Sequence, residues 1–276
     1  MNRTTTAMLT NKSLCVAVTM VFLILGAALV TPLVSSYEPE AMDFTAIQSA
    51  PSWQHWFGTD QVGRDLFLRS MLGAQVSYSV ALIATLVALS IGVPWGLTAG
   101  YAGGRLDMLM MRIVDALYGL PVVLIVILLV VVFGRNQYLL FAALGAFFWL
   151  DIARIVRGQT LRLRQAEFVS SAKLLGANKF HILAQHILPN VAGPIVVYAT
   201  LALPGIILAE SFISFLGLGV QEPDTSWGVL IADGIQTVES TPWLVLCPGT
   251  LLAISAWCFN TIGDQLNSIF EVRSKG

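Results

Sequence analysis

Long apolar stretches alternate with short polar ones along almost the whole chain. A helix needs about 20 mostly apolar residues to cross the hydrocarbon core of a bilayer. Stretches of that order, nearly free of charged residues, predict six helices at 13–34, 77–100, 113–133, 139–156, 191–211 and 244–264. The pattern therefore predicts an all-α membrane protein with about six transmembrane helices.

Composition supports lipid as the surrounding solvent. The 276 residues are 56% hydrophobic and 11% charged, whereas a soluble protein carries about 25% charged residues. The three cysteines, Cys15, Cys247 and Cys258, all lie in apolar stretches and show no C-x-x-C spacing. That placement disfavours a zinc site or a disulfide framework, so we expect no metal in this chain.

The first apolar stretch resembles a signal peptide in one respect, because Arg3 and Lys12 precede it. It has the length of a full span, however, and no clear A-x-A-like cleavage site follows it. We therefore expect a retained helix. Residues 1–70 then form an N-terminal helix with an external segment, and residues 71–276 form a core of five helices with a cytoplasmic segment at 165–189.

The basic residues fall mostly on one side of the predicted membrane. With the N-terminus inside, twelve of the fifteen lie on inner segments and only Arg64, Arg69 and Arg135 on outer ones. The inner set is Arg3, Lys12, Arg105, Arg112, Arg154, Arg157, Arg162, Arg164, Lys173, Lys179, Arg273 and Lys275. Cytoplasmic loops carry an excess of Lys and Arg. This bias predicts that both termini are cytoplasmic, and a dispersed set of this kind indicates no nucleic-acid site.

The inner segment 165–189 carries a helical apolar pattern. Helical spacing places Phe168, Ala172 and Leu175 on one face. Gly176 suits the end of that helix, because glycine accepts the left-handed conformation that helix ends often need.

A second apolar stripe follows, at Phe180, Leu183 and Ile187, and Pro189 is expected to reset the chain before the fifth span. Two short amphipathic helices at the inner surface suit docking in a partner's groove. The alternative is a helix pair lying on the lipid surface.

Small residues mark two further places. Gly92, Gly96 and Gly100 follow one another at four-residue spacing, which lets membrane helices approach closely. Gly217 and Gly219 permit tight, non-helical backbone near a pore mouth.

Charges within spans are candidates for function. Asp115 with Arg112, and Asp151 with Arg154, have the spacing of local structural ion pairs. Glu210 has no obvious local partner, and we consider it, with Gly217 and Gly219, for the translocation path or gate. The alternative for Glu210 is that its carboxylate reaches the outer interface.

Several sequence signatures are missing. The sequence has no G-x-x-x-x-G-K-[ST] loop for nucleotide phosphates, no G-x-S-x-G and no H-E-x-x-H. We therefore expect no catalytic residues, no cofactor and no nucleotide bound by this chain.

The inner segment resembles the signature E-A-A-x3-G-x9-I-x-L-P of binding-protein-dependent ABC importer permeases. Gly176, Leu188 and Pro189 match it, as does Ala172 at the second Ala. The departures are Ser170 for Glu, Ser171 for the first Ala and His186 for Ile. Glu167, one helical turn earlier, is the candidate to replace the missing Glu.

Two outer motifs narrow the resemblance. Residues 57–65, FGTDQVGRD, are similar to F-G-T-D-x-x-G-R-D in dipeptide, oligopeptide and nickel permeases. Ser214 to Gly219, with Pro223 and the Ser226-Trp-Gly228 triplet, is similar to their S-F-L-G-L-G-V-x-x-P-x-x-S-W-G segment.

The resemblance implies a type I ABC importer permease fold in the bacterial inner membrane. It implies as partners a second homologous permease, two ATP-binding subunits and an external solute-binding protein. ATP is then hydrolysed on the partners, and the coupling residues are Glu167, Phe168, Ala172, Leu175, Gly176, Leu188 and Pro189.

Substrate is expected to be short peptides, with nickel or metal chelates as the alternative. Two alternative hypotheses place the protein in another functional class. One is a membrane-embedded enzyme that uses Asp115, Asp151 or Glu210, and the other is a self-contained secondary transporter.

Overall fold

The computed structural model describes residues 12–134 and 136–275, so Arg3 and Arg135 of the predicted charge distribution lie outside the described residues. The helices run in the order α2 (Lys12–Val34), α3 (Leu66–Ala102), α4 (Gly104–Tyr118), α5 (Val122–Phe133), α6 (Gln137–Leu163), α7 (Glu167–Leu174), α8 (Lys179–His181), the π-helix η1 (Ile182–Ile187), α9 (Leu188–Phe215), α10 (Trp227–Ile235) and α11 (Trp243–Lys275).

Among the described residues, five helices are long and apolar enough to cross a membrane: α2, α3, α6, α11, and a continuous helix of α8, η1 and α9. The pair α4 and α5 makes a sixth crossing if its two parts count as one bent span. The expectation of about six transmembrane helices is confirmed.

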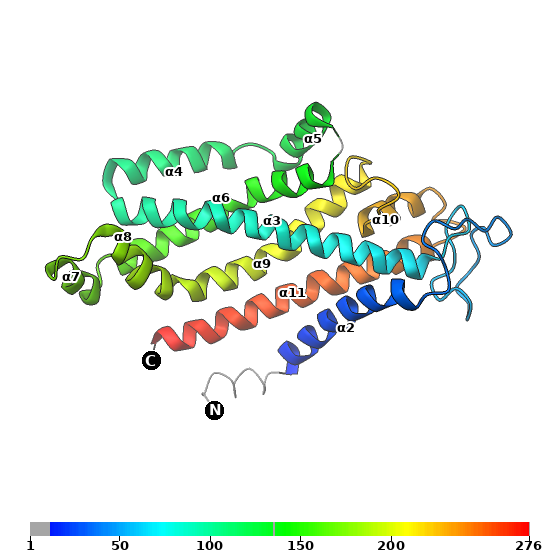
Figure 1. Ribbon diagram of the computed structural model, residues 1–276, viewed down its shortest axis with the longest axis horizontal. Helices are drawn as coiled ribbons and strands as arrows, with labels where there is room; N and C mark the ends of the chain where they lie inside the picture. Colours follow the sequence, from blue (N-terminus) through cyan, green and yellow to red (C-terminus); the bar gives the residue numbers. More distant parts are fainter. Residues whose placement is uncertain (1–11, 135, 276) are drawn as a thin grey trace.

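The long helices lie side by side, and the connections gather at the two ends (Figure 1). One end carries α7 and α8, and we name it the inner end after the predicted orientation. The other end carries residues 35–65 and α10, and we name it the outer end. The predicted domain boundary at residue 70 falls inside α3.

The second span begins eleven residues before the predicted start, at Leu66 instead of 77. Asp65 caps the helix by accepting a hydrogen bond from the Leu68 N–H at 2.7 Å. The first turns include the charged Arg69 and the polar Ser70, and both are buried against protein. A search for uncharged apolar stretches finds the part of a span that faces lipid. It therefore misses helical turns whose charged side chains are buried against protein.

The predicted single helix at 113–133 is wrong. The chain breaks between α4 and α5, which meet at a bend of 78°. Pro121 lies at the break, as the N-cap of α5. Proline donates no backbone hydrogen bond and disfavours helical backbone in the residue before it.

Close packing of α3 on α6 rests on Gly92, Gly96 and Gly100. A Cβ atom on these glycines would lie 2.7, 2.6 and 2.7 Å from the carbonyl oxygens of residues 149, 153 and 157, respectively. Those oxygens repeat every four residues along α6, in step with the glycines. The predicted role of the three glycines in helix approach is confirmed.

Helices α6, α9 and α11 extend past their predicted ends, and two charged residues explain this for α6. The predicted end at 156 excluded Arg157, which lies in the helix and binds Asp107 of α4. Arg154 binds Asp115 of α4 at 2.8 Å and not the nearby Asp151. Neither predicted local ion pair forms among these described residues, because Asp115 and Arg154 pair with each other between helices.

Candidate functional site

The inner segment folds into a helix, a glycine turn and a second helix. The N–H of Ala177 donates to the Ala172 carbonyl at 3.1 Å, and the N–H of Gly176 donates to the Lys173 carbonyl at 3.0 Å. Gly176 has φ of +83°. This combination is a Schellman helix end. The predicted role of Gly176 as the end of the first helix is confirmed.

One side of this segment is anchored on the bundle. Val169, Ile182 and Ile187 are buried in a cluster that includes α3 and α6 residues. Directly before the segment, the guanidinium of Arg164, the C-cap of α6, donates to the Tyr101 carbonyl at 3.0 Å, at the inner end of α3. The segment therefore packs directly against two spans, α3 and α6.

The other side of the segment presents large apolar side chains. Leu174, Leu175 and Phe180 are 90%, 88% and 80% exposed, and Phe168 is 41% exposed. Exposed apolar side chains gathered in this way are typical of an interaction surface.

A hollow of about 750 Å³ lies beside these side chains. We name it the coupling hollow, and its lining includes Phe168, Ala172, Leu175, Gly176, His181 and His186. The predicted face of Phe168, Ala172 and Leu175 is therefore confirmed. The role of this face in coupling stays a prediction.

The second predicted stripe is wrong. Phe180 is exposed, whereas Ile187 is fully buried together with Ile182. Residues 182–187 wind as a π-helix, whose hydrogen bonds reach five residues along the chain. A stripe extrapolated at 3.6 residues per turn therefore loses its register in this segment.

Pro189 does not interrupt the chain as predicted. Helix α9 begins at Leu188 directly after η1, and Pro189 lies in its first turn. Proline is tolerated there. Leu188 is half-buried, and Glu167 is exposed at the start of α7. The coupling roles of these residues also stay predictions.

Glu210 lies inside the protein and not at the outer interface. Its side chain is fully buried and accepts hydrogen bonds from Ser214 at 2.7 Å, Ser77 at 3.2 Å and Ser211 at 3.3 Å. The expectation that Glu210 has no local partner is therefore wrong. The serine hydroxyls join α9 to α3 through the carboxylate, and within this chain they separate it from solvent.

Gly217 and Gly219 form the tight turn that their pattern predicted. Gly217 has φ of +75°, and the N–H groups of Leu218 and Gly217 donate to the carbonyls of Ile213 and Ser214. A Cβ on Gly219 would lie 2.5 Å from the Ser214 Cα. Their part in a gate stays a prediction.

The outer motifs meet in a charge cluster that pattern reading missed. Arg64 binds Asp60 at 2.6 Å and Glu222 at 2.9 Å, although Glu222 is 158 residues away. Arg69 lies 3.7 Å from each of these carboxylates. Burial lowers the pKa of Arg64, but the hydrogen bonds to Asp60 and Glu222 outweigh burial and raise it overall. The cluster ties residues 57–65 to the chain that precedes α10.

The SWG triplet holds α10 against α3. Trp227 is fully buried, and its indole N–H donates to the Ser70 carbonyl at 3.0 Å. A Cβ on Gly228 would collide with Ser211 of α9. Packing is therefore the role of Trp227, as its full burial shows.

Comparison with known proteins agrees with this geometry. The family described as "Binding-protein-dependent transport system inner membrane component" matches residues 92–276. The chain belongs to this family. Its members' description and the long apolar helices make it a multi-pass protein of the bacterial inner membrane.

Permeases named for peptide transport are similar to this chain over most of its length. The oligopeptide transport system permease protein OppC of Haemophilus influenzae is 42% identical over 96% of this chain and 86% of its own. OppC of Escherichia coli K12 is 43% identical over 96% and 88%. The dipeptide transport system permease protein DppC of Bacillus subtilis is 43% identical over 88% and 77%.

A solved structure shows the same fold. The inward-facing MetNI methionine ABC transporter contains a chain that aligns with a TM-score of 0.60. The match has 18% identity and covers 73% of this chain and 96% of that chain. The type I importer permease fold expected from the resemblance is confirmed.

Proposed function

We propose that this chain carries short peptides across the bacterial inner membrane as one half of a translocation pathway. A second homologous permease forms the other half, and an external solute-binding protein delivers the peptide. The observation that carries the proposal is the coupling hollow, which presents an apolar surface at the inner end of a bundle of membrane-spanning helices.

ATP is bound and hydrolysed on two partner subunits. This assignment is supported by the missing phosphate-binding loop in the sequence. An apolar side chain of one ATPase partner would seat against Leu175 and Phe168, which are exposed and line the hollow. Movement of the partner would then pull on α3 and α6 through the buried anchor of the segment.

Peptide is favoured over nickel by two observations. The relatives described above are named for oligopeptides and dipeptides. The described residues also contain no group of three or more His, Cys, Asp or Glu side chains placed to hold a metal ion.

The test is peptide uptake by the assembled transporter. The chain is expressed with its neighbouring permease, ATPase and solute-binding subunits in cells that lack their own peptide permeases. We expect ATP-dependent uptake of a labelled tripeptide, abolished by a phosphate-loop lysine substitution in the ATPase. Uptake of nickel but not of peptides by the same assembly would overturn the assignment of substrate.

A further inference from the structure

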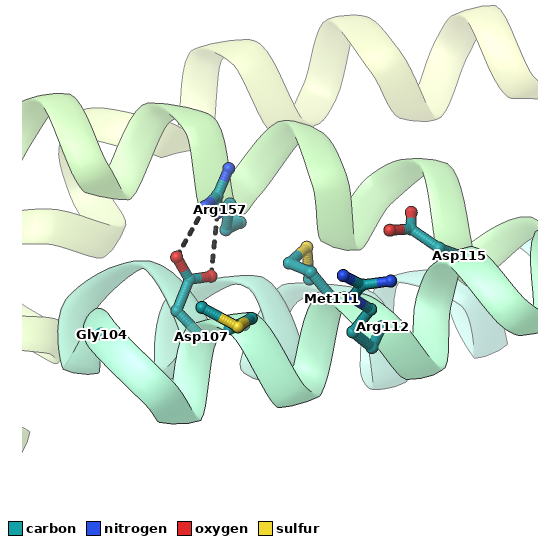
Figure 2. A pocket seen from close by; sticks show the side chains of 7 residues that line it. Gly104, Asp107, Met111, Arg112, Asp115 and Arg157 are labelled. Carbon is teal, nitrogen blue, oxygen red and sulfur yellow. Dashed lines mark hydrogen bonds and ion pairs between the residues drawn. The ribbon is translucent and has the colours of Figure 1, made fainter.

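A second hollow lies between α4 and α6 near the inner end. It measures about 310 Å³, and its lining includes Asp107, Met108, Met111, Arg112, Asp115 and Arg157. Figure 2 shows the side chains of α4 along one wall and Arg157 of α6 opposite. We name it the α4–α6 hollow.

Two of its charged groups have an evident structural role. The guanidinium of Arg157 binds both carboxylate oxygens of Asp107, at 2.9 and 2.6 Å. Asp107 is 7% exposed. A bidentate pair of this kind fixes α4 on α6, and it needs no ligand to explain it.

The other two charged groups retain binding capacity. Arg112 is exposed and has no ion-pair partner within the described part of the chain. Asp115 binds Arg154 through one carboxylate oxygen, and its side chain is 61% exposed. The hollow therefore presents an unpaired guanidinium three residues from a carboxylate that is only partly engaged.

The position of the hollow on a bent pair of apolar helices points to transport. Helices α4 and α5 meet at a 78° bend, directly after Asp115 and Tyr118. Ionisable side chains in membrane spans almost always face the bundle interior or a water-filled cavity. In transporters, interrupted spans mark binding sites.

We propose that the α4–α6 hollow binds the short peptide on the inner part of its path. Arg112 receives the terminal carboxylate and Asp115 the terminal ammonium. Residues three apart on a helix lie about 5–6 Å apart at Cβ, and an extended dipeptide is about 7 Å long. The proposal rests on the proposed function.

Two features favour a zwitterionic peptide over a lipid headgroup. The lining carries two carboxylates and two guanidiniums, so its charges balance, whereas an anionic phosphate would meet both carboxylates. Met108 and Met111 supply the apolar wall. Methionine is flexible and is common at surfaces that accept varied partners, as side chains of differing sequence require.

The test uses the assembled transporter and a photoreactive tripeptide probe with a diazirine side chain. During ATP-driven uptake, we expect labelling of Met108 and Met111 but not of Met110, which lies on the same helix outside the lining. Arg112→Gln should lower labelling and uptake by about tenfold. Arg105→Gln, on the same helix but outside the lining, is the matched control and should change neither.

A C-terminally amidated probe separates binding from structure. It lacks the terminal carboxylate, so we expect weak labelling of the wild-type protein and no further loss in Arg112→Gln. ATPase activity stimulated by the solute-binding protein should persist in both arginine variants, which shows that they assemble.

The outcomes distinguish this site from the proposed function. Wild-type protein that takes up no peptide contradicts the proposed function. Wild-type uptake with equal labelling in Arg112→Gln, or with Met110 labelled as strongly as Met108 and Met111, overturns the site alone. A lipid site would show no peptide labelling and an effect of Arg112→Gln only in vesicles that contain anionic lipid, which also overturns it.

Discussion

Replacing Leu175 with Asp should weaken the binding of the ATPase subunit. Leu175 lines the coupling hollow and is 88% exposed in the chain by itself. Full burial of a leucine contributes about 1.5–3 kcal/mol. Burial of the exposed part of Leu175 in the ATPase subunit therefore contributes about 1.3–2.6 kcal/mol to binding. Losing this contribution weakens the affinity for the ATPase subunit by about ten- to eightyfold.

Leu174 provides a control on the neighbouring position. It is 90% exposed, so it matches Leu175 in residue type and exposure. It is the last residue of α7, directly before the C-cap Leu175, and it lies outside the lining of the hollow. Leu174→Asp should leave affinity close to that of the wild type. The two variants therefore separate contact at the hollow from general apolarity of the segment.

The assay is titration of purified ATPase subunit onto the permease pair in lipid nanodiscs, with peptide uptake measured on the same assemblies. Uptake should fall in Leu175→Asp in parallel with affinity. Permease pairing should persist, because it depends on the spans. Equal affinity in both variants and the wild type would refute docking at the hollow and would favour the helix pair lying on lipid.

Other predictions address orientation, ATP, packing and pH. Cysteines placed after residues 45 and 230 should react with an impermeant reagent from outside and one after residue 170 only from inside; outside labelling at 170 would reverse the topology. The purified chain should bind no ATP analogue in a fluorescence titration, and saturable binding without partners would contradict the missing phosphate loop. Gly96→Ala places a Cβ 2.6 Å from the Ala153 carbonyl oxygen and should cost about 1–3 kcal/mol; Gly158→Ala, with nothing within 4 Å, should cost far less, as thermal unfolding in detergent would show. Burial raises the pKa of Asp233 although Arg69 opposes this, so its ionised form destabilises the fold at neutral pH. Asp233→Asn should therefore raise the melting temperature at pH 7, with a gain that shrinks as pH falls through the raised pKa; a gain independent of pH would exclude this cause.

Local features of the chain were predictable because they depend on neighbours in sequence. The number of spans follows from stretches long enough to cross a bilayer. Gly176 follows from the demand of a Schellman helix end for left-handed backbone. The role of Gly92, Gly96 and Gly100 follows from their regular spacing on one helix face.

Partners distant in sequence were decided only by the tertiary structure. Arg154 binds Asp115 of another helix, and Arg64 binds Glu222 from another outer segment. Glu210 gains one of its hydroxyl donors from Ser77 on α3. No spacing rule encodes such pairs, because they depend on which faces of two helices meet.

The division between lipid-facing and protein-facing surfaces also required the structure. Lipid and a protein core are both apolar, so the type of an apolar residue does not indicate which of the two it contacts. Trp227 illustrates this, since its sequence setting suits a membrane interface while its side chain is fully buried against α3. The sequence by itself determined about how many helices cross the membrane. The packing of the bundle decided where α3 begins, where α4 and α5 break, and which side chains stay exposed.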